Sequence, residues 1–254
     1  MRKKAYAKVN IFLKIVGKRG NYHELLSRFM RVDSLYDELI LKEKTSKDEF
    51  ELVGDFTCEY ENNTIVRAYK ALKQSGFEEP LKSFFKDKSL HVEKNIPSFA
   101  GLGGGSSDGA SFLLLCNESM GLGLGKNELV NIGLKVGADV PFFIHEYKSA
   151  NVKGIGDIVE EFEEDLLDFE ILTPPIQCST AEVFKNFSAK FDLGNINKAW
   201  QNCSSKALLE NFDGKSLNDL CKSAFDLYPA LNDYYKKGYF MSGSGSSMFR
   251  IKNG

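Results

Sequence analysis

A glycine-rich stretch at residues 97–110, with the sequence PSFAGLGGGSSDGA, constrains this chain more than any other segment. It is followed at once by an apolar run that begins at Phe112, an order typical of a loop that opens a helix. The closely spaced glycines carry no Cβ atoms that would hold an anion away from the main-chain N–H groups. We therefore predict a phosphate-binding loop at a helix N-terminus, with an ordinary flexible loop before a core helix as the alternative.

Polar residues after the glycines refine this prediction. Ser106 and Ser107 are expected to cap the first turn of the helix. Asp108 falls in the same turn, where its charge suits the helix dipole but would repel a phosphate, so it is expected to point aside or to face a cation. The stretch is not a P-loop, because no Gly-Lys-Ser/Thr follows Gly101 at the required spacing. It is not a Rossmann fingerprint either, because Ser106 stands where the last glycine is needed.

Composition sets the broader class. The chain has 254 residues, 43% of them hydrophobic, which is enough for one large or two smaller domains. Its 33 basic and 35 acidic residues give a net charge of −2, so no global field would recruit nucleic acid or an anionic membrane. The five cysteines and three histidines show no paired or ligand-like spacing, so we expect neither a disulfide framework nor a structural metal, and we expect a cytoplasmic location. No signal peptide or segment of transmembrane length is evident.

Residues 5–16 alternate strictly between two kinds of side chain and predict a strand. Alanine, valine, isoleucine and leucine line one face, and Lys8, Asn10 and Lys14 lie on the other. Lys8 and Asn10 could therefore reach one ligand from a rigid element. The pattern by itself favours a half-buried strand with a solvated polar face over this ligand-binding role.

Strands and helices are intermixed along the rest of the chain, which predicts an α+β fold. An acidic run at 160–165 is expected to be a solvated boundary between two domains. A small-residue turn at 242–247, SGSGSS, precedes the last strand. The other expected elements are helices over 63–72, capped by Asn63 or Thr64, over 126–136, and after a Ser179-Thr180 cap; strands over 89–94 and 248–251; and a hairpin over 149–160.

Two further motifs have candidate chemistry. Asp139 lies in the segment GADVPFF at 137–143, where partial desolvation would raise its basicity and suit a general base. The alternative, which sequence alone favours, is that Asp139 caps the turn before Pro141. Tyr22 and His23 follow a glycine turn at 17–21 and could supply a stacking aromatic and a hydrogen-bonding ring.

These motifs together resemble the GHMP small-molecule kinases over nearly the whole chain. They are Lys8-x-Asn10, Tyr22-His23, GLGGGSS from Gly101, GADVPFF and the SGSG turn. The Tyr-His pair and GADVPFF are closest to members that act on a cytidine-diphosphate derivative of methylerythritol in the non-mevalonate isoprenoid pathway. The resemblance implies a ribosomal protein S5 domain 2-like N-terminal domain (1–160), a ferredoxin-like C-terminal domain (161–254) and an active site in the cleft between them.

The resemblance also implies residue roles for the ATP-dependent phosphorylation of the substrate's 2-hydroxyl group. Asp139 matches the catalytic base, and Lys8 matches the lysine that keeps this base ionised. Substrate contacts are implied for Asn10, Tyr22, His23, Thr180 and Phe184. ATP contacts are implied for Asn63, Pro97, Ser98, Phe99, Ala100, Gly101, Leu102, Gly103, Gly104, Gly105, Ser106 and Ser107.

Some features of this expected kinase stay open at the sequence level. Mg²⁺ is expected with ATP, with Ser107 and Asp108 as candidate ligands only. The stretch Ser98–Ala100 is bulkier than the family pattern, which leaves the adenosine side of the loop undefined. The alternatives are a GHMP kinase for homoserine, mevalonate or a sugar, and a catalytically silent nucleotide-binding module. No oligomeric state is indicated.

Overall fold

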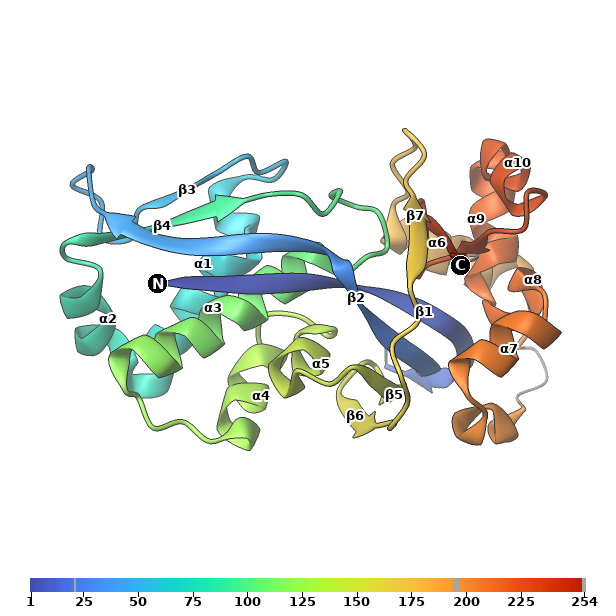
Figure 1. Cartoon of the computed structure of the whole chain (residues 1–254), viewed down its shortest axis with the longest axis horizontal. Coiled ribbons are helices and arrows are strands. Elements are labelled where there is room, and N and C mark those ends of the chain that lie inside the picture. Colours follow the sequence, from blue (N-terminus) through green and yellow to red (C-terminus); the bar gives the residue numbers. More distant parts are fainter. Residues whose placement is uncertain (21, 194–196, 253–254) are drawn as a thin grey trace. The chain divides into compact units, whose positions relative to one another are not determined.

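The computed structural model describes residues 1–20, 22–193 and 197–252 (Figure 1). Its strands are β1 (Arg2–Arg19), β2 (Tyr22–Glu43), β3 (Leu52–Gly54), β4 (Lys88–Glu93), β5 (Ser149–Gly154), β6 (Ile158–Glu161), β7 (Phe169–Leu172), β8 (Phe240–Met241) and β9 (Met248–Ile251). Its α-helices are α1 (Thr64–Leu72), α2 (Glu78–Phe84), α3 (Gly104–Met120), α4 (Lys126–Leu134), α5 (Val140–His145), α6 (Thr180–Lys190), α7 (Ser205–Asn211), α8 (Gly214–Leu217), α9 (Leu220–Leu227) and α10 (Asn232–Tyr235). Four short 3₁₀ or π segments complete the list: η1 (Tyr60–Asn62), η2 (Lys73–Phe77), η3 (Lys198–Asn202) and η4 (Pro229–Leu231).

The chain forms two compact units, and the long strands β1 and β2 contribute to both. Unit 1 comprises residues 1–7, 35–98 and 104–146, and unit 2 comprises 8–34, 99–103 and 147–254. The domain boundary predicted near residue 160 stays a prediction. In the part of the chain that the structure describes, no helix is long and apolar enough to cross a membrane.

Unit 1 packs helices against a small sheet. The second half of β2 pairs antiparallel with β4, with Leu39 opposite Val92, and β3 joins β4 in parallel. Helices α1 and α3 pack side by side (Figure 1). Residues 107–116 of α3 are all buried, so this stretch of the helix is enclosed on every side. Phe50 and Tyr69 stack with their ring centroids 4.4 Å apart.

Unit 2 has two separate sets of paired strands. The first half of β2 pairs antiparallel with β5, with Leu26 opposite Lys153, and β5 pairs with β6. The strands β7, β9 and β8 form a second antiparallel sheet, in that order. Helices α6 and α9 pack together, and their buried side chains share one core with Ile15, Met241 and Met248.

Most predicted elements are confirmed with small changes at their ends. Asn63 caps α1 by accepting a hydrogen bond from the N–H of Ile65, and Ser179 caps α6 in the same way. The predicted hairpin appears as β5 and β6. The predicted helix over 126–136 ends earlier, because Val136 N–H bonds to the carbonyl of Gly133 and tightens the last turn. Residues 17–19 of the predicted turn at 17–21 belong to β1, and Asn21 lies outside the described residues.

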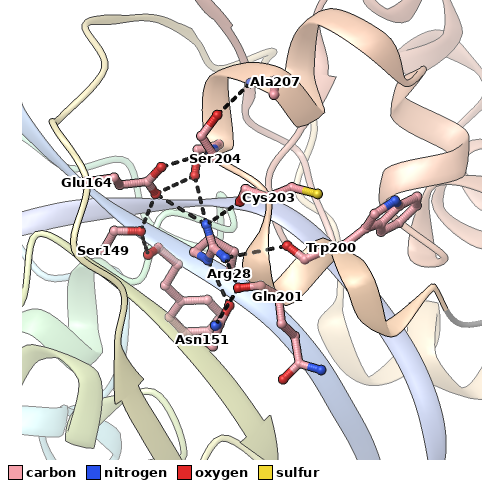
Figure 2. A network of polar contacts seen from close by, with 11 residues as sticks. Arg28, Ser149, Asn151, Glu164, Trp200, Gln201, Cys203, Ser204 and Ala207 are labelled. Carbon is pink, nitrogen blue, oxygen red and sulfur yellow. Dashed lines mark hydrogen bonds and ion pairs between the residues drawn. The ribbon is translucent and has the colours of Figure 1, made fainter.

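A buried arginine ties the strands of unit 2 to the segment that contains η3 (Figure 2). Arg28, on β2, is 0% exposed. Its Nε donates to Asn151 Oδ1 at 2.8 Å, and one terminal nitrogen donates to the carbonyl of Gln201 at 2.7 Å. The guanidinium carbon lies 3.4 Å from the ring centroid of Phe162. The planar guanidinium therefore stacks on one face and donates along its edges.

The counter-ion of Arg28 corrects one sequence-based expectation. Glu164, in the acidic run predicted to be solvated, lies 3.4 Å from the guanidinium and is largely buried. Its carboxylate also accepts from Ser149 Oγ at 2.7 Å and from the N–H of Ser205 at 2.8 Å. The prediction was wrong for Glu164 because a fully buried guanidinium requires a nearby anion. The other acidic residues of the run are exposed: Glu160, Glu161, Glu163 and Asp165.

Replacing Arg28 with leucine is expected to lower the free energy of unfolding by about 3–5 kcal/mol, because it leaves Glu164 buried without its cation. Urea denaturation followed by circular dichroism measures this change. The double variant Arg28→Leu/Glu164→Gln is expected to recover part of the loss. Arg250→Leu, which removes the exposed ion pair with Glu170, is the matched control and should change stability little. A loss of stability in Arg250→Leu as large as that in Arg28→Leu would contradict the expectation.

Candidate active site

The glycine-rich loop and the small-residue turn at 242–247 meet in unit 2. Gly101 has a φ of +75°, and a Cβ at this position would lie 2.2 Å from the carbonyl oxygen of Ser242. Only glycine therefore fits there. The hydroxyl of Ser242 donates to the carbonyl of Gly101 at 2.8 Å, and the N–H of Ser247 donates to the carbonyl of Ala100 at 3.0 Å. The second turn thus holds the first loop by both its side chain and its backbone.

The bulky residue in the loop points to solvent. Phe99 has a φ of +53° and is 60% exposed. A positive φ is uncommon for an aromatic residue and indicates a locally constrained backbone. Ala100 and Leu102, by contrast, are buried, so the loop is anchored on both sides of Gly101. The predicted ATP residues Pro97 and Ser98 lie in unit 1, half-buried and exposed respectively.

The helix that follows the loop starts earlier than predicted. Helix α3 begins at Gly104, so Ser106 and Ser107 lie inside its first turn instead of capping it. The prediction was wrong because glycines here adopt helical geometry, although they are poor helix formers. The hydroxyl of Thr64, the first residue of α1, donates to the carbonyl of Gly105 at 2.5 Å. The first turn of α3 is therefore held by the N-terminus of α1.

Asp108 faces a cation, one of the two outcomes predicted for it. Lys94 donates to Asp108 Oδ2 at 2.6 Å and also binds Asp37. Asp37 is fully buried and accepts from the N–H groups of Asn95 and Ile96 at 2.5 and 2.8 Å. Asp37 and Lys94 thereby fix the segment that enters the glycine-rich loop. Sequence reasoning missed both, because a charged residue in or beside a strand carries no local sign of a distant partner.

Two carboxylates share one ammonium in this buried group. Burial raises the pKa of Asp108 to about 7. The Lys94 ammonium opposes this shift, and the Asp37 carboxylate adds to it. Burial alone would lower the pKa of Lys94, but the carboxylates of Asp108 and Asp37 outweigh it and raise that pKa. Two carboxylates and one ammonium would leave an unpaired negative charge in a buried site, which is unfavourable. The group therefore takes up a proton near neutral pH. Since Asp108 is paired with Lys94 and buried, it does not fit the role of a Mg²⁺ ligand.

Asp139 stands at the N-cap position of α5, with Pro141 in the first turn of that helix. Its side chain makes no capping hydrogen bond, although capping was the use that the sequence favoured. The carboxylate is half-buried.

The polar face of β1 is buried, which corrects the expectation that it is solvated. Lys8 is 4% exposed and Asn10 is 2% exposed. Lys8 Nζ donates to Asn10 Oδ1 at 2.6 Å and to the carbonyl of Gly101 at 3.2 Å. Further along the strand, Lys14 pairs with Asp219 in unit 2. The alternation predicted two faces correctly but could not reveal that distant segments cover the polar one.

A residue that the sequence analysis missed sets the orientation of Asn10. The hydroxyl of Ser27 donates to the carbonyl of Phe12 at 2.5 Å, so its oxygen accepts from Asn10 Nδ2 at 3.0 Å. The amide oxygen of Asn10 must then face Lys8. Ser27 alternates with its neighbours on β2 like any strand residue, and no local pattern distinguishes it.

The residues predicted to hold cytidine, on the first half of β2 and in α6, all lie in unit 2. The rings of His23 and Phe184 stack with centroids 5.0 Å apart and planes 28° from parallel. Burial, with a smaller contribution from Lys18, lowers the pKa of His23, which favours a neutral imidazole. Tyr22 is 66% exposed. The Thr180 hydroxyl lies 2.8 Å from that of Ser244, next to the turn that holds the loop.

Asn63 uses its side chain within unit 1. Its Oδ1 accepts from the N–H of Ile65, and the residue is buried. As the cap of α1, Asn63 positions Thr64, whose hydroxyl binds the carbonyl of Gly105. Among the described residues, no group of three or more histidine, cysteine, aspartate or glutamate side chains could hold a metal ion.

This chain is similar to known proteins over most of its length. A family model for the GHMP kinases N terminal domain matches residues 63–147, which include the glycine-rich loop and Asp139. The 4-diphosphocytidyl-2-C-methyl-D-erythritol kinase of Sulfurimonas denitrificans is 53% identical over 98% of this chain and 96% of its own length. The protein of the same name from Campylobacter jejuni subsp. jejuni is 47% identical over 98% of this chain and 99% of its own.

Solved structures show the same breadth of similarity. A crystal structure of 4-(cytidine 5'-diphospho)-2C-methyl-D-erythritol kinase has a TM-score of 0.79 and 27% identity, covering 100% of this chain and 91% of that one. A mevalonate kinase with 17% identity has a TM-score of 0.64, covers 100% of this chain and 91% of its own, and shows the shared fold alone. The similarity thus extends well beyond the glycine-rich loop.

Asp108→Asn is expected to change how stability depends on pH. The carboxyl has an ordinary pKa of 3.8 in the unfolded chain and about 7 in the folded one, so the folded state binds more protons between these values. Stability therefore falls as the pH rises through this window, by on the order of 2–4 kcal/mol, and the asparagine variant should lack this fall. Urea denaturation at pH 5 and pH 8 measures the difference. Asp233→Asn, at an exposed site, should keep the wild-type slope.

Proposed function

We propose that this chain, which belongs to the family of 4-diphosphocytidyl-2-C-methyl-D-erythritol kinases, transfers the γ-phosphoryl group of ATP to the 2-hydroxyl of 4-(cytidine 5'-diphospho)-2-C-methyl-D-erythritol. The observation that carries this function is an identity of 47–53% with relatives of that name over 98% of the chain. The predicted resemblance and the α+β GHMP fold class are both confirmed. The reaction belongs to the non-mevalonate route to isoprenoid precursors.

In this proposal the glycine-rich loop binds the ATP phosphates. The positive φ angles of Gly101 and Gly103 support this role, because such a backbone presents its N–H groups without side chains in the way. Helix α3, which follows, has 17 residues and directs the positive end of its dipole toward the loop. Mg²⁺ would accompany ATP and would reduce the charge of the phosphates. We propose no protein ligand for it.

The transfer itself is assigned to Asp139 and Lys8, which must both reach the reacting groups. Asp139 accepts the proton of the substrate hydroxyl, whose oxygen forms the new bond to the γ-phosphorus while the bond to the ADP oxygen breaks. The ammonium of Lys8 keeps the carboxylate ionised and stabilises charge on the transferred group. The hydrogen bonds of Lys8 to Asn10 and Gly101 support this role, because they fix the position of the ammonium.

The cytidine end is assigned to Tyr22, His23, Thr180 and Phe184. The exposed ring of Tyr22 and the stacked pair of His23 and Phe184 offer flat surfaces on which a nucleobase can pack. Asn10 would contact the sugar-like end from its buried position on β1.

The direct test mixes the purified protein with Mg-ATP and the cytidine-diphosphate substrate and follows ADP. Homoserine, mevalonate and galactose serve as competing acceptors. Turnover only with the cytidine-diphosphate substrate supports the proposal. Turnover only with another alcohol would assign a different GHMP kinase activity, and no turnover with any acceptor would favour a silent nucleotide-binding module.

Asp139→Asn is expected to lower kcat by about 100-fold or more, because the amide cannot accept the hydroxyl proton. Binding of ATP, measured by calorimetry, should stay close to that of the wild type. Asp168→Asn, at an exposed position, is the matched control and should keep full activity. Near-normal turnover of Asp139→Asn would remove Asp139 from its assigned role.

Tyr22→Ala is expected to raise the substrate KM roughly 10-fold, because stacking on a base contributes about 1–3 kcal/mol. The change in kcat should be smaller, since stacking far from the reacting atoms stabilises the ground state and the transition state alike. Tyr22→Phe keeps the ring and should behave like the wild type. Initial-rate kinetics at varied substrate concentration give both constants, and an unchanged KM would count against the cytidine site.

A further inference from the structure

Ser188 lies next to the ring of His23, and the mechanism above does not use it. Its Oγ lies 2.6 Å from His23 Nε2. The same oxygen donates to the carbonyl of Phe184, one turn earlier in α6, at 3.1 Å. The serine hydroxyl therefore connects the imidazole to the backbone of the helix.

The two contacts of Ser188 together determine which nitrogen of His23 carries the proton. A serine hydroxyl has one proton, and the carbonyl of Phe184 can only accept it. The oxygen of Ser188 must then accept from Nε2, so the proton of the neutral imidazole is on Nε2. The other ring nitrogen, Nδ1, is left as a hydrogen-bond acceptor.

The ring of His23 is also held in place. It stacks on Phe184 with the centroids 5.0 Å apart and meets Phe187 edge to face at 6.4 Å. Burial lowers the pKa of His23, which keeps the ring neutral. Within residues 1–20, 22–193 and 197–252, Nδ1 of His23 has no hydrogen-bond partner. One tautomer in one orientation thus presents one acceptor.

We propose that Ser188 is a specificity-determining residue: by holding the proton of His23 on Nε2, it makes Nδ1 an acceptor that selects a nucleobase carrying an amino group. The inference rests on the proposed function, in which His23 lies at the cytidine end. Cytosine presents an amino donor at its edge, where uracil presents a carbonyl acceptor. Uracil would place an acceptor against Nδ1 and leave both atoms unpaired, so a uridine ligand is disfavoured.

The test compares binding of CDP and UDP by calorimetry to the wild type and to Ser188→Ala, Ser188→Thr and Lys185→Ala. The wild type should prefer CDP. In Ser188→Ala the proton is no longer held on Nε2. The dissociation constant for UDP divided by that for CDP should therefore fall about tenfold from its wild-type value. Ser188→Thr keeps the hydroxyl and should restore the preference. Lys185→Ala changes an exposed residue of the same helix and serves as the control.

A second measurement reports the tautomer itself. Long-range ¹H–¹⁵N correlation of the His23 side chain should show Nε2 protonated in the wild type and a mixture of tautomers in Ser188→Ala. Protonation of Nδ1 in the wild type would overturn the inference, and so would an unchanged CDP to UDP ratio in Ser188→Ala. Neither measurement needs turnover. A protein that lacks kinase activity but still prefers CDP over UDP in a Ser188-dependent way would therefore refute the proposed function and support this inference.

Discussion

The contact between Gly101 and the carbonyl of Ser242 is the constraint on which the glycine-rich loop depends. The two residues are 141 positions apart in the chain, and their backbones approach so closely that a Cβ on Gly101 would lie 2.2 Å from that carbonyl. The carbonyl of Gly101 in turn accepts from Ser242 Oγ at 2.8 Å and from Lys8 Nζ at 3.2 Å. The loop, the SGSGSS turn and the proposed catalytic lysine are therefore positioned through one peptide group.

Within each unit, buried polar side chains are held in chains of hydrogen bonds. Ser27 orients the amide of Asn10, and Asn10 holds the ammonium of Lys8. In unit 1, Lys94 joins the carboxylates of Asp37 and Asp108. An unpaired polar group in such surroundings is costly, so each pairing removes alternative conformations. The result is a preorganised arrangement, which phosphoryl transfer requires because positioning and charge stabilisation supply most of its catalysis.

Recognition of the substrate is separated from the phosphate loop in the sequence. The loop is the proposed ATP site, whereas β2 and α6 bring His23, Phe184 and Ser188 together in unit 2. In the proposed assignment, the preference for one base follows from the position of a single proton on the His23 ring, which the Ser188 hydroxyl holds without contacting the ligand.

The sequence by itself determined the local features of this protein. The Asn63 and Ser179 caps, the alternation of β1 and the glycine-rich loop all depend on residues a few positions apart, so their patterns predicted them. The family motifs identified the kinase class but left the roles of Lys8 and Asp139 as proposals. Sequence also predicted that Asp108 would point aside or face a cation, without indicating that the cation is Lys94.

Only the tertiary structure decided which polar residues are buried and what they bind. In the folded chain the polar face of β1 is buried, Glu164 points inward to Arg28, and Ser188 lies against His23. Each of these contacts joins residues brought together from distant parts of the chain. A strand or helix pattern indicates which residues share a face, but burial and pairing depend on the segment that packs against that face, and no local pattern specifies that segment.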